Sequence, residues 1–185
     1  MSLDTIDQAP PGAITTGDRL WRCSSYERVQ ELSLAMVRER SRRMRLSLFL
    51  EWGNMCDAPW AYRSCYAELL RDALKQVSLR EVLPAEECAW FESMEPMIQV
   101  YRGCEAGRVR GLSWTTDLKV ARGFAAGKRC VNSHPTLASA VIPKEHVLAL
   151  FLSRQEYEVI VDPRRLRQLK IQPLEELEDK YRWAS

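Results

Sequence analysis

The spacing of apolar residues changes near residue 95, and this change constrains the fold more than any other feature of the sequence. Upstream, apolar residues recur at three- and four-residue steps that place them on one stripe of a helix, as in Tyr62, Tyr66, Leu69, Leu70, Ala73, Leu74 and Val77. Downstream, short runs rich in Val, Ile and Leu are bounded by turn-forming or charged residues, as strands are. The sequence therefore predicts an α+β fold with a helical N-terminal layer packed on a small, strongly bent β-core.

Capping and breaking residues define the expected helices of the N-terminal half. Ser24 or Ser25 begins a helix, because a short hydroxyl side chain accepts from the free N–H groups of the first turn. Gly53 and the stretch 57–59 separate two longer helical regions. Pro84 fits the first turn of a further helix, where its missing N–H is not needed.

The C-terminal half is expected to be built mainly from strands. The predicted strands span 97–101, 139–142, 147–152 and 157–161. One predicted helix spans 118–126 and begins at Asp117, and another spans 174–183 and is entered through Pro173. We expect a loose tail over residues 1–20 and a single domain over 21–185, divided into a helical layer (21–95) and the β-core (96–185).

Charge and hydropathy limit the classes of partner. The net charge of +2 is too small to predict nucleic-acid binding. A run of arginines is interpreted as a solvated helix face, or alternatively as a patch that docks an acidic partner or a phosphate backbone: Arg38, Arg40, Arg42, Arg43 and Arg45. No apolar run approaches the roughly 20 residues that span a bilayer, and the N-terminus lacks a signal-peptide pattern. We therefore expect no membrane partner, and a cytoplasmic protein or one delivered into a target cell without a cleaved signal peptide.

Cysteine and histidine usage does not favour a metal site. The chain holds six cysteines and two histidines, without a Cys-x-x-Cys pair. Zinc ligands cluster at short spacing, so we expect free, buried thiols and no metal. The sequence also has neither a Gly-rich phosphate-binding loop with Lys nor a paired Ser-His-Asp set.

Three polar motifs follow one another in the strand-rich half. The first is Val100-Tyr101-Arg102-Gly103, with an arginine at the predicted end of a strand. The second, 111–116, contains Ser113, Trp114 and Thr115, and the third, 154–163, contains Glu156 and Glu158. Each has an ordinary structural interpretation: a surface arginine, a strand or cap, and two carboxylates on one solvated face of a strand. However, Glu158 begins a predicted buried strand, where an unpaired carboxylate is costly, and this favours a site.

Together the three motifs resemble those of the mono-ADP-ribosyltransferase superfamily, in the branch marked by Arg, then Ser-x-Ser/Thr, then Glu-x-Glu. The resemblance covers about residues 97–163. It implies a two-sheet β-core and an enzyme that moves ADP-ribose from NAD to a macromolecular acceptor, with release of nicotinamide. A glutamate two residues before the catalytic one implies that the acceptor is a protein arginine. Compact transferases of this kind often act as toxins or as phage-encoded modifiers of host proteins, which a partner protein can neutralise.

The resemblance also implies a role for each motif residue. Arg102 binds the diphosphate and the adenosine-side ribose of NAD, and the backbone of Gly103 holds the nicotinamide carboxamide. Ser113 braces the catalytic glutamate, and Thr115 occupies the third position of the same motif. Glu158 is the catalytic glutamate, which stabilises positive charge on the anomeric carbon of the nicotinamide ribose. Glu156 orients and deprotonates an incoming guanidinium.

Flanking residues complete the predicted NAD site. Trp114 is assigned to stacking on nicotinamide or adenine, with core packing as the alternative, whereas Phe124 is expected in the core. The loop 127–135 is expected beside the NAD cleft. The segment 151–155, with Arg154 exposed, is expected to contact the acceptor.

Two other functions stay open from the sequence. The same motifs fit an NAD glycohydrolase, in which water takes the place of the acceptor. A non-enzymatic interaction protein with a decayed transferase core would instead work through the arginine run and the helical half.

Overall fold

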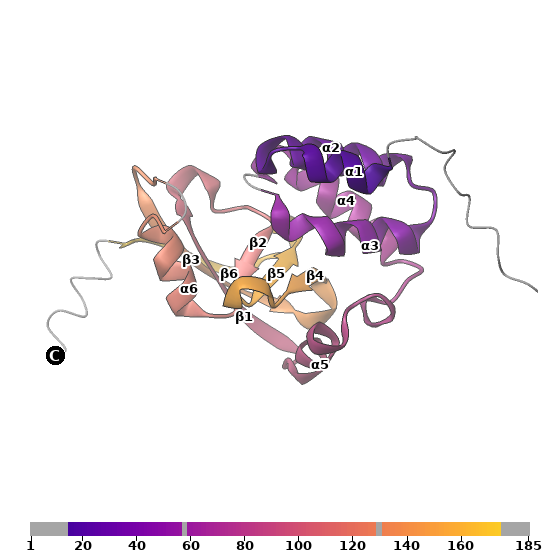
Figure 1. Ribbon diagram of the computed structural model, residues 1–185. Coiled ribbons are helices and arrows are strands. Elements are labelled where there is room, and N and C mark those ends of the chain that lie inside the picture. Colours follow the sequence, from indigo (N-terminus) through magenta and orange to yellow (C-terminus); the bar gives the residue numbers. More distant parts are fainter. Residues whose placement is uncertain (1–14, 57–58, 129–130, 175–185) are drawn as a thin grey trace, which may run out of the picture.

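The computed structural model describes residues 15–56, 59–128 and 131–174. Its helices are α1 (Thr16–Arg22), α2 (Ser25–Arg38), α3 (Arg42–Trp52), α4 (Arg63–Ala73), α5 (Ala85–Ser93) and α6 (Leu118–Ala125). Its strands are β1 (Met97–Glu105), β2 (Ser113–Thr115), β3 (Pro135–Pro143), β4 (Val147–Phe151), β5 (Glu158–Val161) and β6 (Arg167–Pro173). The fold is α+β, as predicted: helices α1–α4 gather at one end of the molecule and α6 lies at the other (Figure 1).

Side-chain caps start the N-terminal helices. Ser24 caps α2 through a capping box with Glu27, which confirms the predicted start of that helix. Thr15 and Asp18 form the same arrangement at α1, so the tail predicted over 1–20 is wrong from Thr15 onward. The Thr-x-x-Asp spacing was the sequence feature that could have found this helix. Residues 1–14, and the helix predicted over 174–183 beyond Leu174, lie outside the described residues.

The helical layer packs against the end of the sheet that carries β4. Helix α2 buries one stripe of apolar residues, with Val29, Leu32 and Met36. Phe49 of α3 meets Phe151 of β4 with ring centroids 6.1 Å apart, which joins the layer to the sheet. Figure 1 shows α3 and α4 directly above β4 and β5.

The strands form one antiparallel sheet in the order β4-β5-β2-β1-β3-β6. Strands β1 and β3 pair continuously, from Met97 opposite Pro143 to Glu105 opposite Pro135. Strands β1 and β2, in contrast, pair only at Tyr101 and Thr115, and we call this junction the seam. The structure therefore has a single sheet in place of the two implied by the resemblance, with two three-stranded halves joined at the seam.

Strand boundaries differ most from the prediction at the two ends of the β-core. Strand β1 continues to Glu105, so Arg102 lies inside the strand rather than at its end. Strand β6 was not predicted, and it ends at Pro173. Pro84 is the N-cap of α5 rather than part of its first turn. Asp117 caps α6 by accepting from the backbone N–H groups of Lys119 and Val120, as expected.

Three of the arginines in the run 38–45 hold the layer together. Arg45 donates to the carbonyls of Met36 and Glu39 and pairs with Asp72 at 3.0 Å. Arg42 pairs with the same carboxylate at 3.1 Å. Arg43 donates to the carbonyl of Glu81 at 2.8 Å. The run is thus largely an internal brace, and this weakens its interpretation as a solvated face or as a docking patch.

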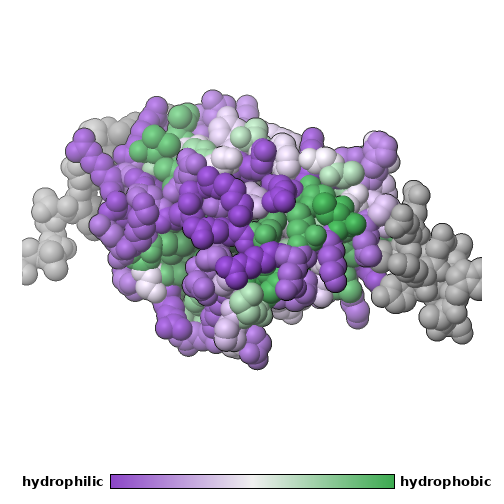
Figure 2. Space-filling model, turned by 180° about the vertical axis from the view of Figure 1, so that it is seen from behind, coloured by the Kyte–Doolittle hydropathy of each residue, from purple (hydrophilic) through white to green (hydrophobic). Residues whose placement is uncertain are grey.

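The surface is mostly polar. Figure 2 shows the back of the molecule, where hydrophilic residues predominate and apolar ones form separate patches. Cys23, Cys65 and Cys88 are free thiols, but they are only partly buried, so the expectation of buried thiols is wrong for these three. None of the described helices combines the length and the apolar character needed to cross a bilayer.

Candidate functional site

The seam brings the three sequence motifs together. Tyr101 of β1 lies opposite Thr115 of β2, and Thr115 lies opposite Glu158 of β5. Arg102 directly follows Tyr101 in β1, and Ser113 lies two residues before Thr115 in β2. Segments that are far apart in the chain therefore meet in the middle of the sheet.

Ser113 and Glu158 lie close together on the paired strands β2 and β5. The Ser113 hydroxyl donates a hydrogen bond to the Glu158 carboxylate. Ser113 pairs with Ile160, so both partners of this bond are positioned by the β2–β5 ladder. A serine that braces the glutamate is the arrangement that the resemblance implied for these two residues.

Burial dominates the electrostatics of Glu158. It raises the pKa of this carboxyl above the ordinary value of 4.5, because a charged form loses hydration inside the protein. The hydrogen bond from Ser113 lowers the pKa, and the negative charge of Glu156 raises it. The guanidinium charges of Arg154 and Arg102 lower it. Glu158 is thus a perturbed acid surrounded by charges of both signs, a combination that is common at functional sites.

Arg102 bridges the seam. Because Tyr101 occupies the paired row, the Arg102 side chain leaves β1 on the other face of the strand. Its Nη1 donates to the carbonyl of Ser113, and its Nε donates to the carbonyl of Arg108 at 3.2 Å. A Cβ on Gly111 would lie 2.5 Å from the Arg102 guanidinium carbon, so any side chain there would require the guanidinium to shift. Two of the guanidinium donors therefore serve the fold, while the charge still acts on Glu158.

Gly103 has a packing role that explains the glycine. A Cβ at this position would lie 1.8 Å from the carbonyl oxygen of Ala121 and 2.3 Å from the amide nitrogen of Ala125. Helix α6 therefore crosses β1 backbone to backbone at Gly103. The role in holding a carboxamide that the resemblance implied is not needed to account for a glycine here.

Glu156 lies in a turn rather than on a strand. Strand β5 begins at Glu158, so the prediction that the two glutamates alternate along one strand is wrong. The segment between β4 and β5 has left-handed backbone at three residues, Arg154 (φ 62°), Gln155 (φ 53°) and Tyr157 (φ 46°). Even so, the turn brings the Glu156 carboxylate close enough to raise the pKa of Glu158. Glu156 itself is only 8% exposed.

Thr115 holds this turn in place. Its hydroxyl donates to the carbonyl of Glu156 at 2.6 Å and accepts from the backbone N–H of Asp117 at 3.0 Å. The side chain is buried. Thr115 thus connects β2, the start of α6 and the turn, and its hydroxyl is occupied by these contacts.

Trp114 packs in the hydrophobic core. Its side chain is 2% exposed, and its Nε1 donates to the carbonyl of Gly111 at 3.0 Å. It leaves β2 on the face opposite Ser113 and Thr115. The assignment of Trp114 to stacking on NAD is therefore corrected to core packing, the alternative considered from the sequence.

The remaining predicted segments lie around the seam. Phe124 is half-buried on α6, whose end is capped by the Asn132 amide through the carbonyls of Phe124 and Ala125. Arg154 is exposed, as expected, and donates to the carbonyl of Asn54 in the short turn after α3. Tyr157 meets Trp90 of α5 with ring centroids 5.9 Å apart. Asn54 and Trp90 were missed from the sequence, because no local motif marks them.

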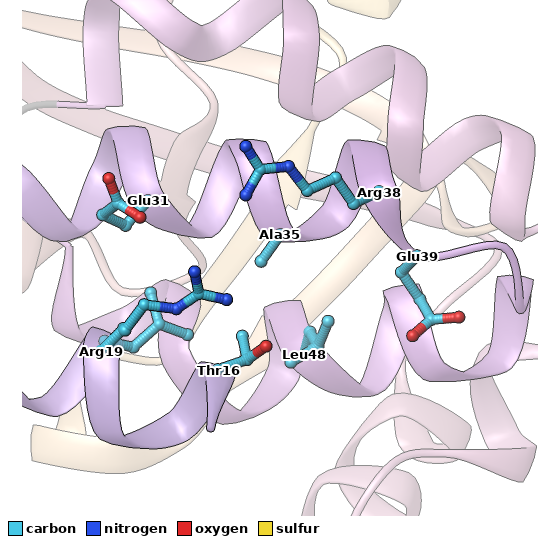
Figure 3. A pocket seen from close by; sticks show the side chains of 8 residues that line it. Thr16, Arg19, Glu31, Ala35, Arg38, Glu39 and Leu48 are labelled. Carbon is cyan, nitrogen blue, oxygen red and sulfur yellow. The ribbon is translucent and has the colours of Figure 1, made fainter. Parts of the chain in front are cut away.

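Two hollows lie away from the seam. One of about 220 Å³, between α1, α2 and α3, is shown in Figure 3, where Arg19 and Arg38 reach toward its centre. Glu31 and Glu39 also line it, so the charges balance and favour no single class of ligand. The other, of about 260 Å³, lies at the end of α6 beside Asn132. Neither hollow includes Arg102, Ser113 or Glu158.

In the parts of the chain that the structure describes, no three potential His, Cys, Asp or Glu metal ligands cluster. We compared the chain with protein family models, with curated proteins and with solved structures, and none of these comparisons gave a match.

Proposed function

We propose that the protein is an NAD-dependent mono-ADP-ribosyltransferase that modifies a macromolecular acceptor, with a protein arginine as the favoured target. The observation that carries the proposal is the placement of Ser113 and the half-buried Glu158 on the paired strands β2 and β5 beside the seam, where the Ser113 hydroxyl lowers the pKa of the Glu158 carboxyl. The charges of Arg102 and Arg154 act on the same carboxylate. The near-separation of the sheet into two halves at this point also supports likeness to a two-sheet transferase core.

Glu158 would act on the nicotinamide ribose. When the bond between nicotinamide and the ribose breaks, the nicotinamide nitrogen takes the bonding electron pair and leaves as a neutral base. Positive charge then develops on the anomeric carbon. A fixed carboxylate stabilises that charge most strongly where water is excluded. The burial that raises the pKa of Glu158 is therefore offset when a cationic centre arrives beside it.

Glu156 would act on the acceptor, and Arg102 would act on the diphosphate of NAD. The acceptor nitrogen forms the new bond to the anomeric carbon and loses a proton, which the Glu156 carboxylate is positioned to take. Arg102 presents a positive charge to the diphosphate. Because two of its donors already bind backbone carbonyls, NAD binding there involves a rearrangement of the Arg108–Ser113 loop.

NAD hydrolysis is the second candidate. The side chain of Glu156 is only 8% exposed, which favours a small acceptor such as water over a bulky guanidinium. Decay to a non-enzymatic protein is disfavoured by the intact contact between Ser113 and Glu158.

The test compares wild type, Glu158→Gln and the control Glu92→Gln with NAD labelled in the ADP-ribose part. Glu92 is exposed and pairs with Arg80 outside the seam. We expect the wild type and the control to release nicotinamide and to label protein in a lysate. In Glu158→Gln both rates should fall by about 10²–10³, the usual loss for one preorganised group.

The outcomes separate the candidates. Nicotinamide release without labelled protein supports the hydrolase. Release that survives Glu158→Gln at the wild-type rate, or no release from the folded wild type, contradicts both enzymatic proposals.

A further inference from the structure

The turn that carries Glu156 is held in an unfavourable conformation. Three of its residues have positive φ, and none of them is glycine. Each such residue costs on the order of 1–3 kcal/mol and persists only when its surroundings fix it. The turn therefore depends on contacts from outside itself.

The sheet fixes the half of the turn nearest β5. Thr115 donates to the carbonyl of Glu156, and the backbone N–H of Thr116 donates to the carbonyl of Tyr157 at 3.2 Å. These bonds hold the carbonyls of Glu156 and Tyr157, but they do not reach Ser153 or Arg154.

The helical layer fixes the other half through one residue. The Asn54 amide donates to the Ser153 hydroxyl at 2.9 Å, and the Arg154 guanidinium donates to the Asn54 carbonyl. Asn54 belongs to the short turn Gly53–Met55 that directly follows α3. Its Oδ1 is buried and has no hydrogen-bond partner among the described residues, which is a costly arrangement for a purely structural asparagine.

The far end of β5 is tied to the same layer. Arg71 of α4 pairs with the Asp162 carboxylate at 3.1 Å, and that carboxylate is almost fully buried. Strand β5 begins at Glu158 and is thus anchored to the helical layer at both of its ends.

We propose that Asn54 is a positioning residue, through which the helical layer holds the β4–β5 turn and so sets the placement of Glu156 and Glu158. Its effect on catalysis rests on the proposed function. Its effect on the turn does not. The helical half would then be part of the catalytic apparatus rather than a separate binding module.

The test uses the full chain with Asn54→Ala, Ser153→Ala and the double variant. Arg43→Ala is the control, because it removes a contact within the layer that does not touch the turn. The first readout is exchange of the Gln155 amide, which donates to the carbonyl of Leu152. The loss of one hydrogen bond should speed this exchange about fivefold in either single variant. The double variant should be no faster than the single variants, because both remove the same bond.

The second readout is titration of the Glu158 carboxyl, followed by NMR of labelled glutamate. A looser turn admits water, so the pKa of Glu158 should move down toward its ordinary value in Asn54→Ala and stay in place in Arg43→Ala. If NAD is turned over, kcat should fall about fivefold to tenfold, with KM changed less than twofold.

Unchanged Gln155 exchange and unchanged Glu158 titration in a folded Asn54→Ala variant would overturn the proposal. A wild type that does not consume NAD contradicts the proposed function alone, because the exchange and titration readouts still decide whether Asn54 holds the turn.

Discussion

The two halves of the sheet are built in different ways. Strands β1, β3 and β6 pair over long stretches, and α6 lies directly on the backbone at Gly103. Strands β2, β5 and β4 are shorter, and at the seam the Arg102 side chain makes a connection of the kind that the backbone ladder makes elsewhere. The long half is a scaffold, whereas the short half holds the polar groups of the candidate site. This division predicts where substitutions damage the fold and where they damage function.

The largest effect on stability is expected in the scaffold half. In Gly103→Ala the new methyl group would overlap the backbone of α6, so the helix must move away from β1. We expect a loss of about 3 kcal/mol in the free energy of unfolding, measured by denaturant titration. Gly107→Ala is the control, because a Cβ there meets nothing within 4 Å. Equal stability of the two variants would contradict the backbone-to-backbone contact.

A smaller loss of stability is expected from a substitution at Thr115. In Thr115→Val the shape is kept, but the carbonyl of Glu156 and the N–H of Asp117 lose their partner. Leaving such buried groups unsatisfied should cost about 2 kcal/mol in thermal or denaturant unfolding. Thr116→Val, which changes a half-buried neighbour, should cost clearly less. A Thr115→Val protein as stable as wild type would place the turn outside the control of β2.

The smallest effect is expected in the pH dependence of stability. The folded protein holds a proton on Glu158 more tightly than the unfolded chain does, because the carboxyl pKa is raised. The contribution of Glu158 to stability therefore falls as pH rises from the ordinary value of 4.5 through the raised one. The hydrogen bond from Ser113 and the guanidinium charges act against this effect of burial.

Glu158→Gln removes this cost of burying a charge. Across the same pH range its stability should increase relative to wild type, as followed by thermal unfolding at a series of pH values. A stability difference that does not vary with pH would show that Glu158 titrates normally. A Gln variant that gains stability while losing NAD turnover would mark Glu158 as a residue kept for function.

The sequence predicted the helical layer better than the β-core. Helix α2 and its Ser24 cap followed from periodicity and capping, which are local properties. Strand β6 was not predicted, because its residues are largely exposed and do not alternate between buried and exposed positions. Only its pairing with β3 defines it as a strand. The position of Glu156 was missed because positive φ at non-glycine residues leaves no mark in composition.

The sequence predicted which residues belong to the candidate site better than it predicted how they are arranged. The resemblance implied that Ser113 lies beside Glu158, and the structure places the two residues close together on paired strands. The packing role of Gly103 depends on where α6 crosses β1, and the burial of Trp114 depends on which face of β2 is covered. The part played by Asn54 depends on a contact between distant segments. None of these three features can be derived from local spacing.

The order of the strands also determines when the site is completed during synthesis. Strand β2 lies between β1 and β5, and β5 leaves the ribosome last of the three. Contacts within the N-terminal helices are local and form early, whereas pairing of β2 with β5 requires residue 158 and its neighbours. A nascent chain that ends at residue 151 thus holds Arg102 and Ser113 without Glu158. The candidate site is assembled only after most of the polypeptide has emerged.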